Sequence, residues 1–122
     1  MSARRILVVD DNIEAAELLA ELLQLLGHTT FVANSGYDAL SVVGKFQPHL
    51  AFLDIGMPGM SGFDLARALH RIPHFSTLPL VAVTGWNDVT TIQNAKDAGF
   101  RLHLTKPAGV DKIAHAVEIF TS

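Results

Sequence analysis

The chain has 122 residues, a formal net charge of −3 and no cysteine. This length suits one core, so we expect a single domain over residues 1–122, and the missing cysteines exclude disulfide and thiolate chemistry. Scattered lysines and arginines argue against a nucleic-acid surface, and no apolar stretch approaches the roughly 18 residues of a membrane span, so we predict a cytoplasmic protein without membrane contact.

Short apolar segments alternate with amphipathic segments five times along the chain. The apolar segments are rich in Val, Leu and Phe and are continuous rather than alternating, which is typical of strands covered on both faces of a parallel sheet. We expect strands at Ile6–Val9, Thr30–Ala33, Leu50–Leu53, Leu80–Val83 and Leu102–Leu104.

A helix follows each predicted strand. The first separates acidic from apolar residues on two stripes, as a half-buried helix does. Ser61 and Asp64 form the signature of a capping box at the start of the third. The five helices are expected between Asn12 and Leu26, from about Gly36 to Phe46, after Ser61, around Val89 to Ala95, and around Val110 to Val117.

Five such units predict an α/β fold, a flavodoxin-like (βα)5 domain with a doubly wound parallel sheet and right-handed crossovers. Five strands favour the order 2-1-3-4-5 over the six-stranded dinucleotide-binding order. In both orders ligands bind beyond the carboxyl ends of the strands, so the site residues should lie at that edge.

Polar residues stand at the carboxyl ends of four predicted strands. Asp10 and Asp11 follow the first strand, Asp54 the third, Thr84 the fourth and Lys106 the fifth. Neighbouring strands lie about 4.8 Å apart, so the aspartates and Thr84 should converge within side-chain reach. Lys106 starts two strands from Asp54, and its long side chain can span most of that distance of about 10 Å.

Such a cluster suggests phosphoryl chemistry at a metal site. Crowded carboxylates repel one another unless a cation neutralises them, and oxygen ligands without Cys or His select Mg²⁺ or Mn²⁺ over zinc. A carboxylate flanked by a divalent ion, a lysine and a hydroxyl can attack phosphorus as a nucleophile. Asp11 and Glu14 also fit a capping box of the first helix, and both interpretations stay open.

Four motifs in register resemble those of the receiver domain of two-component response regulators. They are Val8-Val9-Asp10-Asp11-Asn12, Leu53-Asp54-Ile55-Gly56-Met57-Pro58-Gly59-Met60-Ser61-Gly62, Val83-Thr84-Gly85, and Ala98-Gly99-Phe100 followed by Lys106-Pro107. Each motif is weak alone, but together they cover essentially the whole chain. The first two also look like those of hybrid histidine kinases, so the chain is either a stand-alone regulator or a segment of such a kinase.

The resemblance implies a role for several motif residues. The phosphoacceptor would be Asp54. The Mg²⁺ ligands would be Asp10, Asp11, Asp54 and the backbone carbonyl of Gly56. The residues in contact with the phosphoryl group would be Thr84, Gly85 and Lys106.

The resemblance also implies features at four further positions, three of which depart from the residue usual in the family. His103 stands where the family has a switch aromatic, and it would move together with Thr84 on phosphorylation. The peptide bond before Pro107 would be cis. Gly85 replaces the alanine often found after the switch threonine, which loosens that loop. Trp86 is unusually large for this position and would tune the lifetime of the acyl phosphate.

The resemblance implies a phosphorylation-dependent signalling switch rather than an enzyme. A histidine kinase or histidine phosphotransfer protein would donate the phosphoryl group. The face formed by the fourth helix, the fifth strand and the fifth helix would present the change to an unknown output partner. The chain would be a monomer or a weak dimer.

Three other functions are compatible with the fold. An aspartate-nucleophile phosphatase would need Asp-x-Asp-x-Thr, which Asp54-Ile55-Gly56-Met57-Pro58 lacks. A flavin protein would need a loop rich in Ser, Thr and Gly after the first strand, where two acids stand instead. A phosphorylation-independent interaction module is the third, although the full set of acidic, threonine and lysine positions weighs against it.

Overall fold

Five parallel strands form the centre of the computed structural model, which describes residues 3–86 and 88–121. Their order is β2-β1-β3-β4-β5, which confirms the predicted order. The strands are β1 (Arg5–Val9), β2 (Thr29–Ala33), β3 (Leu50–Asp54), β4 (Leu80–Thr84) and β5 (Leu102–Thr105). Each is one residue longer than its apolar segment because backbone pairing continues into a polar end residue.

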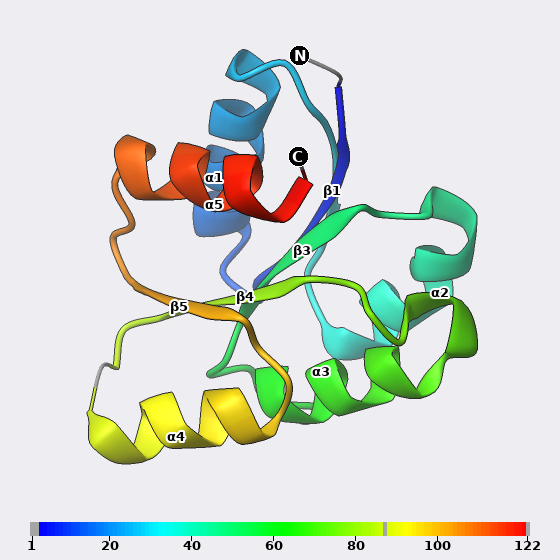
Figure 1. Cartoon of the computed structure of the whole chain (residues 1–122), viewed down its shortest axis with the longest axis vertical. Coiled ribbons are helices and arrows are strands. Elements are labelled where there is room, and N and C mark those ends of the chain that lie inside the picture. The colour runs from blue at the N-terminus through cyan, green and yellow to red at the C-terminus, as the bar shows by residue number, and fades with distance from the viewer. Residues whose placement is uncertain (1–2, 87, 122) are drawn as a thin grey trace.

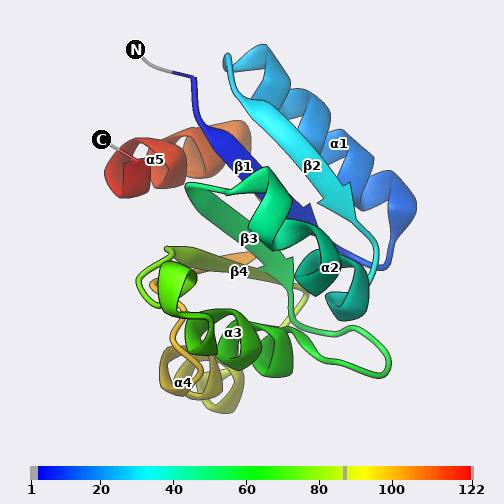
Figure 2. The same ribbon diagram turned by 90° about the vertical axis from the view of Figure 1, so that its right-hand side faces the viewer.

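Helices cover both faces of the sheet (Figures 1 and 2). α1 and α5 lie on one face, and α2, α3 and α4 lie on the other. The helices are α1 (Ile13–Leu25), α2 (Gly36–Phe46), α3 (Gly62–Arg71), α4 (Val89–Asp97) and α5 (Val110–Thr121), with a short 3₁₀ helix, η1 (Pro73–Phe75), after α3. No helix in the described part of the chain is long and apolar enough to cross a bilayer.

Alternating side chains of the central strands divide the core into two layers. Leu7, Leu53 and Ala82 face α2, α3 and α4, whereas Val8 and Phe52 face α1 and α5. β1, β3 and β4 are buried on both faces, as predicted. The prediction was wrong for β2 and β5, which are only partly buried because each is an edge strand with one neighbour.

Side chains cap the amino ends of α1, α2, α3 and α4. Ser61 and Asp64 form the predicted capping box of α3. Ser35 caps α2 by accepting the N–H of Asp38. The suggested capping box of Asp11 and Glu14 was wrong, because Asn12 is the N-cap residue of α1. Asp11 is therefore not the capping residue of α1, and its side chain is exposed.

Candidate functional site

Three aspartates meet at the carboxyl edge of the sheet. Asp10 and Asp11 follow β1, and Asp54 is the last residue of β3, which lies beside β1. One carboxylate oxygen from each lies within 4.8 Å of the others. Asp10 and Asp54 are buried, and Asp11 is exposed. Three hard oxygen ligands with one open side fit a divalent ion such as Mg²⁺, so the acidic cluster can hold a metal.

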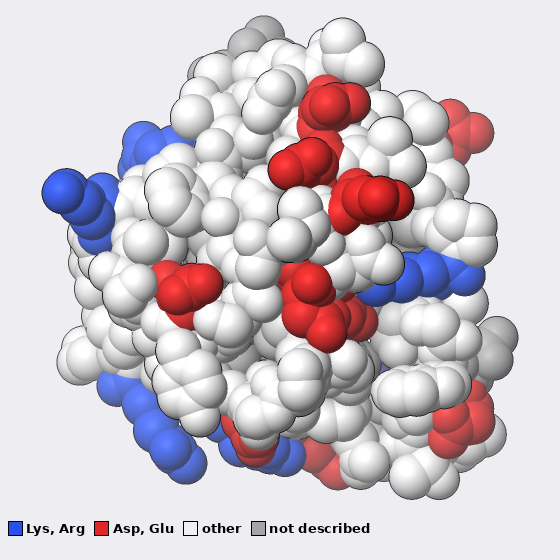
Figure 3. Space-filling view, turned by 180° about the vertical axis from the view of Figure 1, so that it is seen from behind, with Lys and Arg blue, Asp and Glu red and all other residues white. Residues whose placement is uncertain are grey.

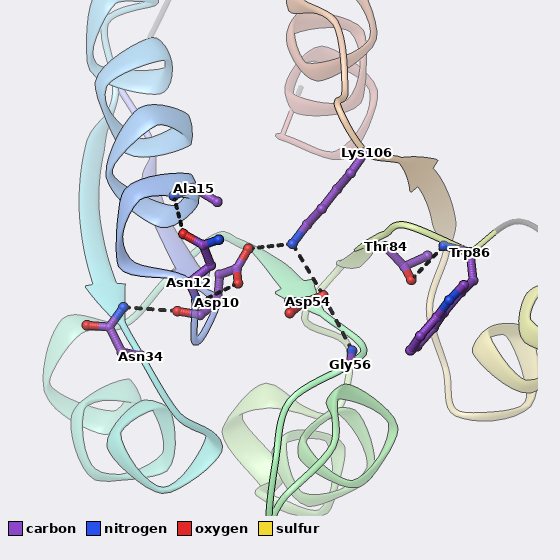
Figure 4. Close-up of polar contacts among 9 residues, drawn as sticks. All are labelled: Asp10, Asn12, Ala15, Asn34, Asp54, Gly56, Thr84, Trp86 and Lys106. Atoms are coloured by element: carbon purple, nitrogen blue, oxygen red, sulfur yellow. Dashed lines mark hydrogen bonds and ion pairs between the residues drawn. The ribbon is translucent and has the colours of Figure 1, made fainter.

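Lys106 extends from the end of β5 to the two buried aspartates (Figure 4). Its Nζ donates to Oδ2 of Asp10 at 2.7 Å and lies 3.5 Å from Oδ1 of Asp54. The backbone N–H of Lys106 donates to the carbonyl of Thr84, and its peptide bond to Pro107 is cis. The side chain therefore crosses the sheet edge over β4, as its length predicted.

Crowding changes the proton affinity of the two interacting groups. Burial, and after it the charge of Asp10, raises the pKa of Asp54 to about 6, although Lys106 acts in the opposite direction. Burial lowers the pKa of Lys106, but its hydrogen bond to Asp10 and the charges of both aspartates outweigh burial and raise it overall. At neutral pH Asp54 is therefore an ionised carboxylate in an unfavourable environment, which is the state a nucleophile needs.

Thr84 ends β4 and is buried, and its hydroxyl is hydrogen-bonded to the following loop rather than to the aspartates. Asp54 pairs with Val83 across the sheet, so Thr84 stands one residue further along its strand and faces the other layer. Its Oγ1 accepts the N–H of Trp86 at 3.2 Å. The expected convergence of Thr84 with the aspartates is thus not a direct contact in this structure.

The two glycines with predicted roles flank the site. The N–H of Gly56 donates to Oδ1 of Asp54 at 3.4 Å, so the loop after β3 turns around this carboxylate. Gly85 lies in the exposed loop after Thr84, where an added Cβ would meet no atom within 4 Å. Space alone therefore does not require glycine at position 85.

Three supporting residues were not identified from the sequence. Nδ2 of Asn34 donates to the backbone carbonyl of Asp10 at 2.9 Å, and the N–H of Asn12 donates to Oδ1 of Asp10 at 2.9 Å. A Cβ on Gly62 would collide with the carbonyl of Asp54, so glycine lets α3 start against β3. Asn34 directly follows β2 at the same sheet edge, so it could have been predicted from the rule that site residues lie beyond the carboxyl ends of the strands.

Trp86 and His103 lie next to each other on the β4 side of the site. Nε2 of His103 is 2.9 Å from the carbonyl oxygen of Trp86. The indole ring lies against Gly56, and more than half of its surface is exposed. Roles for both residues were predicted from the sequence, but the hydrogen bond between them was not, because that bond depends on how β5 pairs with β4.

Known proteins resemble this chain in sequence and structure. Residues 6–118 match the response regulator receiver domain family. Sporulation initiation phosphotransferase F of Bacillus subtilis is 33% identical over 118 residues, which span 97% of this chain and 94% of that protein. The signal receiver domain of a signal transduction histidine kinase from Syntrophus aciditrophicus is 29% identical and superposes with a TM-score of 0.88, covering 97% of this chain and 89% of that one. Chemotaxis protein CheY4 of Vibrio cholerae, at 24% identity and a TM-score of 0.92, shares the fold over 98% of this chain and 99% of its own.

Proposed function

This chain belongs to the response regulator receiver domain family, and on that premise we propose that it is a signalling switch that accepts a phosphoryl group on Asp54. Receiver domains of two-component systems are regulatory phosphoacceptors. One observation carries the assignment to Asp54: its carboxylate is buried, lies 3.5 Å from Nζ of Lys106 and shares a three-carboxylate cluster with Asp10 and Asp11.

The reaction would be attack of an Asp54 carboxylate oxygen on the phosphorus of a phosphohistidine. The new bond joins that oxygen to phosphorus, the phosphorus–nitrogen bond breaks, and its electron pair stays on the imidazole of the donor. Lys106 would move its hydrogen bonds toward the phosphoryl oxygens and neutralise part of their charge. The donor would be a histidine kinase or a histidine phosphotransfer protein.

The carboxylates of Asp10, Asp11 and Asp54 and the backbone carbonyl of Gly56 would hold Mg²⁺ or Mn²⁺. A bound ion supplies charge neutralisation for the carboxylates and for the incoming phosphoryl oxygens. The donor set supports this proposal because it contains only oxygen ligands, and the charge of Lys106 alone leaves two of the three carboxylates uncompensated.

The switch would start at Thr84. Its hydroxyl now accepts a hydrogen bond from Trp86, which leaves the hydroxyl hydrogen free to donate to a phosphoryl oxygen. The added group brings about −1.5 to −2 charges. Thr84 would shift toward it and His103 would move together with the loop that it binds at Trp86, so that α4, β5 and α5 present a changed face to an output partner.

A groove between α1 and α5 is the proposed docking place of the phosphodonor. It has a volume of about 650 Å³ and is lined by Leu18, Leu22, Leu25, Pro107 and Val110 among others, with Asp54 also in its lining. Leu18 and Leu25 are 70% and 85% exposed. Acidic side chains gather on the face shown in Figure 3, and α1 exposes Glu14, Glu17 and Glu21. These features suit an amphipathic donor helix with basic flanks.

Replacement of the phosphoacceptor is the main test. Incubation with phosphoramidate and Mg²⁺ should add one phosphoryl group to the wild type, measured by intact mass, and none to Asp54→Asn. Asp38→Asn, which removes an exposed carboxylate of α2, is the matched control and should be labelled like the wild type. Full labelling of Asp54→Asn would contradict the assignment, and an unlabelled wild type would favour a phosphorylation-independent module.

The docking groove is tested with two donors. Leu18→Asp should reduce transfer from a phosphohistidine protein at least about tenfold, because it puts a charge into the apolar groove, while labelling by phosphoramidate stays unchanged. Ile119→Asp is the control, since it replaces an exposed apolar residue of α5 outside the groove lining. Equal transfer rates for Leu18→Asp and the wild type would rule out this docking surface.

A further inference from the structure

Side chains of two neighbouring strands hold both backbone polar groups of Trp86. The N–H of Trp86 donates to Oγ1 of Thr84 at 3.2 Å (Figure 4), and its carbonyl oxygen lies 2.9 Å from Nε2 of His103. A carbonyl only accepts, so Nε2 of His103 carries the hydrogen of this bond. Thr84 is the last residue of β4 and His103 lies in β5, so the loop at Trp86 is tied to both strands where it leaves the sheet.

This backbone places the indole ring directly against Gly56. A Cβ at Gly56 would lie 3.2 and 3.3 Å from Cζ3 and Cη2 of Trp86, which is tighter than ordinary van der Waals contact, so the ring packs close to the backbone of Gly56. The N–H of Gly56 donates to the carboxylate of Asp54. The ring therefore borders Asp54 on the Gly56 side, whereas Lys106 and Asp10 lie on the opposite side (Figure 4).

Packing alone holds this ring weakly. Trp86 is 59% exposed, so much of the indole contacts solvent rather than protein. With few packing contacts, the position of the ring depends on its backbone, and the backbone depends on Thr84 and His103. Thr84 is also the residue proposed to turn its hydroxyl to the phosphoryl group, which leaves the bond from His103 as the anchor that does not itself contact the phosphoryl group.

We propose that His103 is a positioning residue that holds Trp86 against Gly56 and thereby slows loss of the phosphoryl group from Asp54. This inference rests on the proposed phosphoacceptor role of Asp54. In hydrolysis a water oxygen bonds to phosphorus, the bond from phosphorus to the Asp54 oxygen breaks, its electron pair returns to the carboxylate, and inorganic phosphate leaves. A ring fixed beside the group limits the approach of that water.

The anchor is tested first without phosphorylation. Trp86 is the only tryptophan of the chain, so its fluorescence reports this ring alone. His103→Phe keeps an aromatic ring but loses the donor, and His103→Gln places an amide nitrogen near the position of Nε2. Acrylamide quenching of the metal-free protein should increase in His103→Phe and stay at the wild-type level in His103→Gln. Equal quenching in all three proteins would overturn the proposal.

The lifetime of the phosphoryl group is tested next. After labelling with phosphoramidate and removal of the donor, release of inorganic phosphate should be about fivefold faster in Trp86→Ala and about threefold faster in His103→Phe, the range expected for one lost hydrogen bond. His103→Gln should hydrolyse like the wild type. The double variant His103→Phe/Trp86→Ala should be no faster than Trp86→Ala, because His103 acts through Trp86.

Multiplied rates in the double variant would show that His103 acts independently of Trp86 and would overturn the proposal. A wild type that takes up no label would instead defeat the phosphoacceptor role. The quenching experiment would still report the anchor in that case, so the two failures are distinguishable.

Discussion

Titratable side chains crowd both edges of the sheet. Those at the amino edge are neutral at neutral pH, whereas those at the carboxyl edge keep their charge. At the amino edge, Nδ1 of His28 accepts the N–H of Arg4 at 3.1 Å, and Nδ1 of His49 accepts the N–H of Arg5 at 3.0 Å. Burial, and after it the neighbouring arginines, lowers the pKa of both histidines. The imidazoles are therefore neutral at neutral pH, and each satisfies a backbone donor at the start of β1.

At the carboxyl edge the same crowding does not remove the charge. The pKa of Asp54 rises only to about 6, so this carboxylate is still ionised at neutral pH, next to Asp10 and with Lys106 as the shared cation. Crowded groups that can lose their charge complete the structure, whereas crowded groups that keep it leave an electrostatic cost that a bound ion or a phosphoryl group can relieve.

The largest expected effect on stability comes from removing the charge at the carboxyl edge. The pKa of Asp54 is about 6 in the folded protein against 3.8 in the unfolded chain, so the folded state binds the proton more tightly. Ionised Asp54 therefore costs stability in full above about pH 6, and the cost disappears as the pH falls toward about 4. In EDTA, Asp54→Asn should raise the free energy of unfolding by about 2 kcal/mol at about pH 8 and by almost nothing at about pH 4.

Urea unfolding curves across this pH range measure the difference. Asp38→Asn, with an exposed carboxylate, should differ from the wild type by less than about 0.5 kcal/mol throughout. A gain for Asp54→Asn that does not depend on pH would mean that its charge is not the source of the cost, and the contrast between the two edges would be lost.

A smaller effect of the opposite sign is expected at the amino edge. The pKa of His28 and His49 is lowered in the folded state, so their contribution is complete above the unfolded pKa of 6.5 and is lost as the pH falls below it. Protonation at Nδ1 removes the acceptor that each backbone N–H uses. The double variant His28→Asn/His49→Asn keeps a hydrogen-bond acceptor that does not titrate. Between about pH 7.5 and pH 5 its free energy of unfolding should therefore fall by about 1 kcal/mol less than that of the wild type.

Thermal or urea unfolding at both pH values checks this prediction, with His115→Asn on the exposed side of α5 as the control. If the double variant loses as much stability as the wild type on acidification, the histidines do not act as neutral caps. Combining these changes with Asp54→Asn would sharpen the comparison, because the acid-induced loss of the histidines would then be seen without the opposing gain from Asp54.

The position of the acidic cluster was accessible from the sequence because it follows from strand ends. Asp10 and Asp54 lie directly beyond an apolar segment, and Asp11 and Lys106 lie one residue further along. The strand order then brings them together. The hydroxyl of Thr84 shows the limit of this reasoning. The prediction that Thr84 ends the fourth strand was correct. A shift of one residue in register decides which layer its side chain faces, and its hydroxyl accepts a hydrogen bond from Trp86 instead of meeting the aspartates.

Periodicity and strand-end chemistry by themselves determined the fold, the strand order and the edge that carries the acids, because burial of apolar segments permits few arrangements of five βα units. Only the tertiary structure decided that His103 bonds the carbonyl of Trp86, that Leu18 and Leu25 border a groove, and that two histidines cap β1. Those features join residues far apart in the chain across particular registers and helix separations, and local sequence carries no information on such distances.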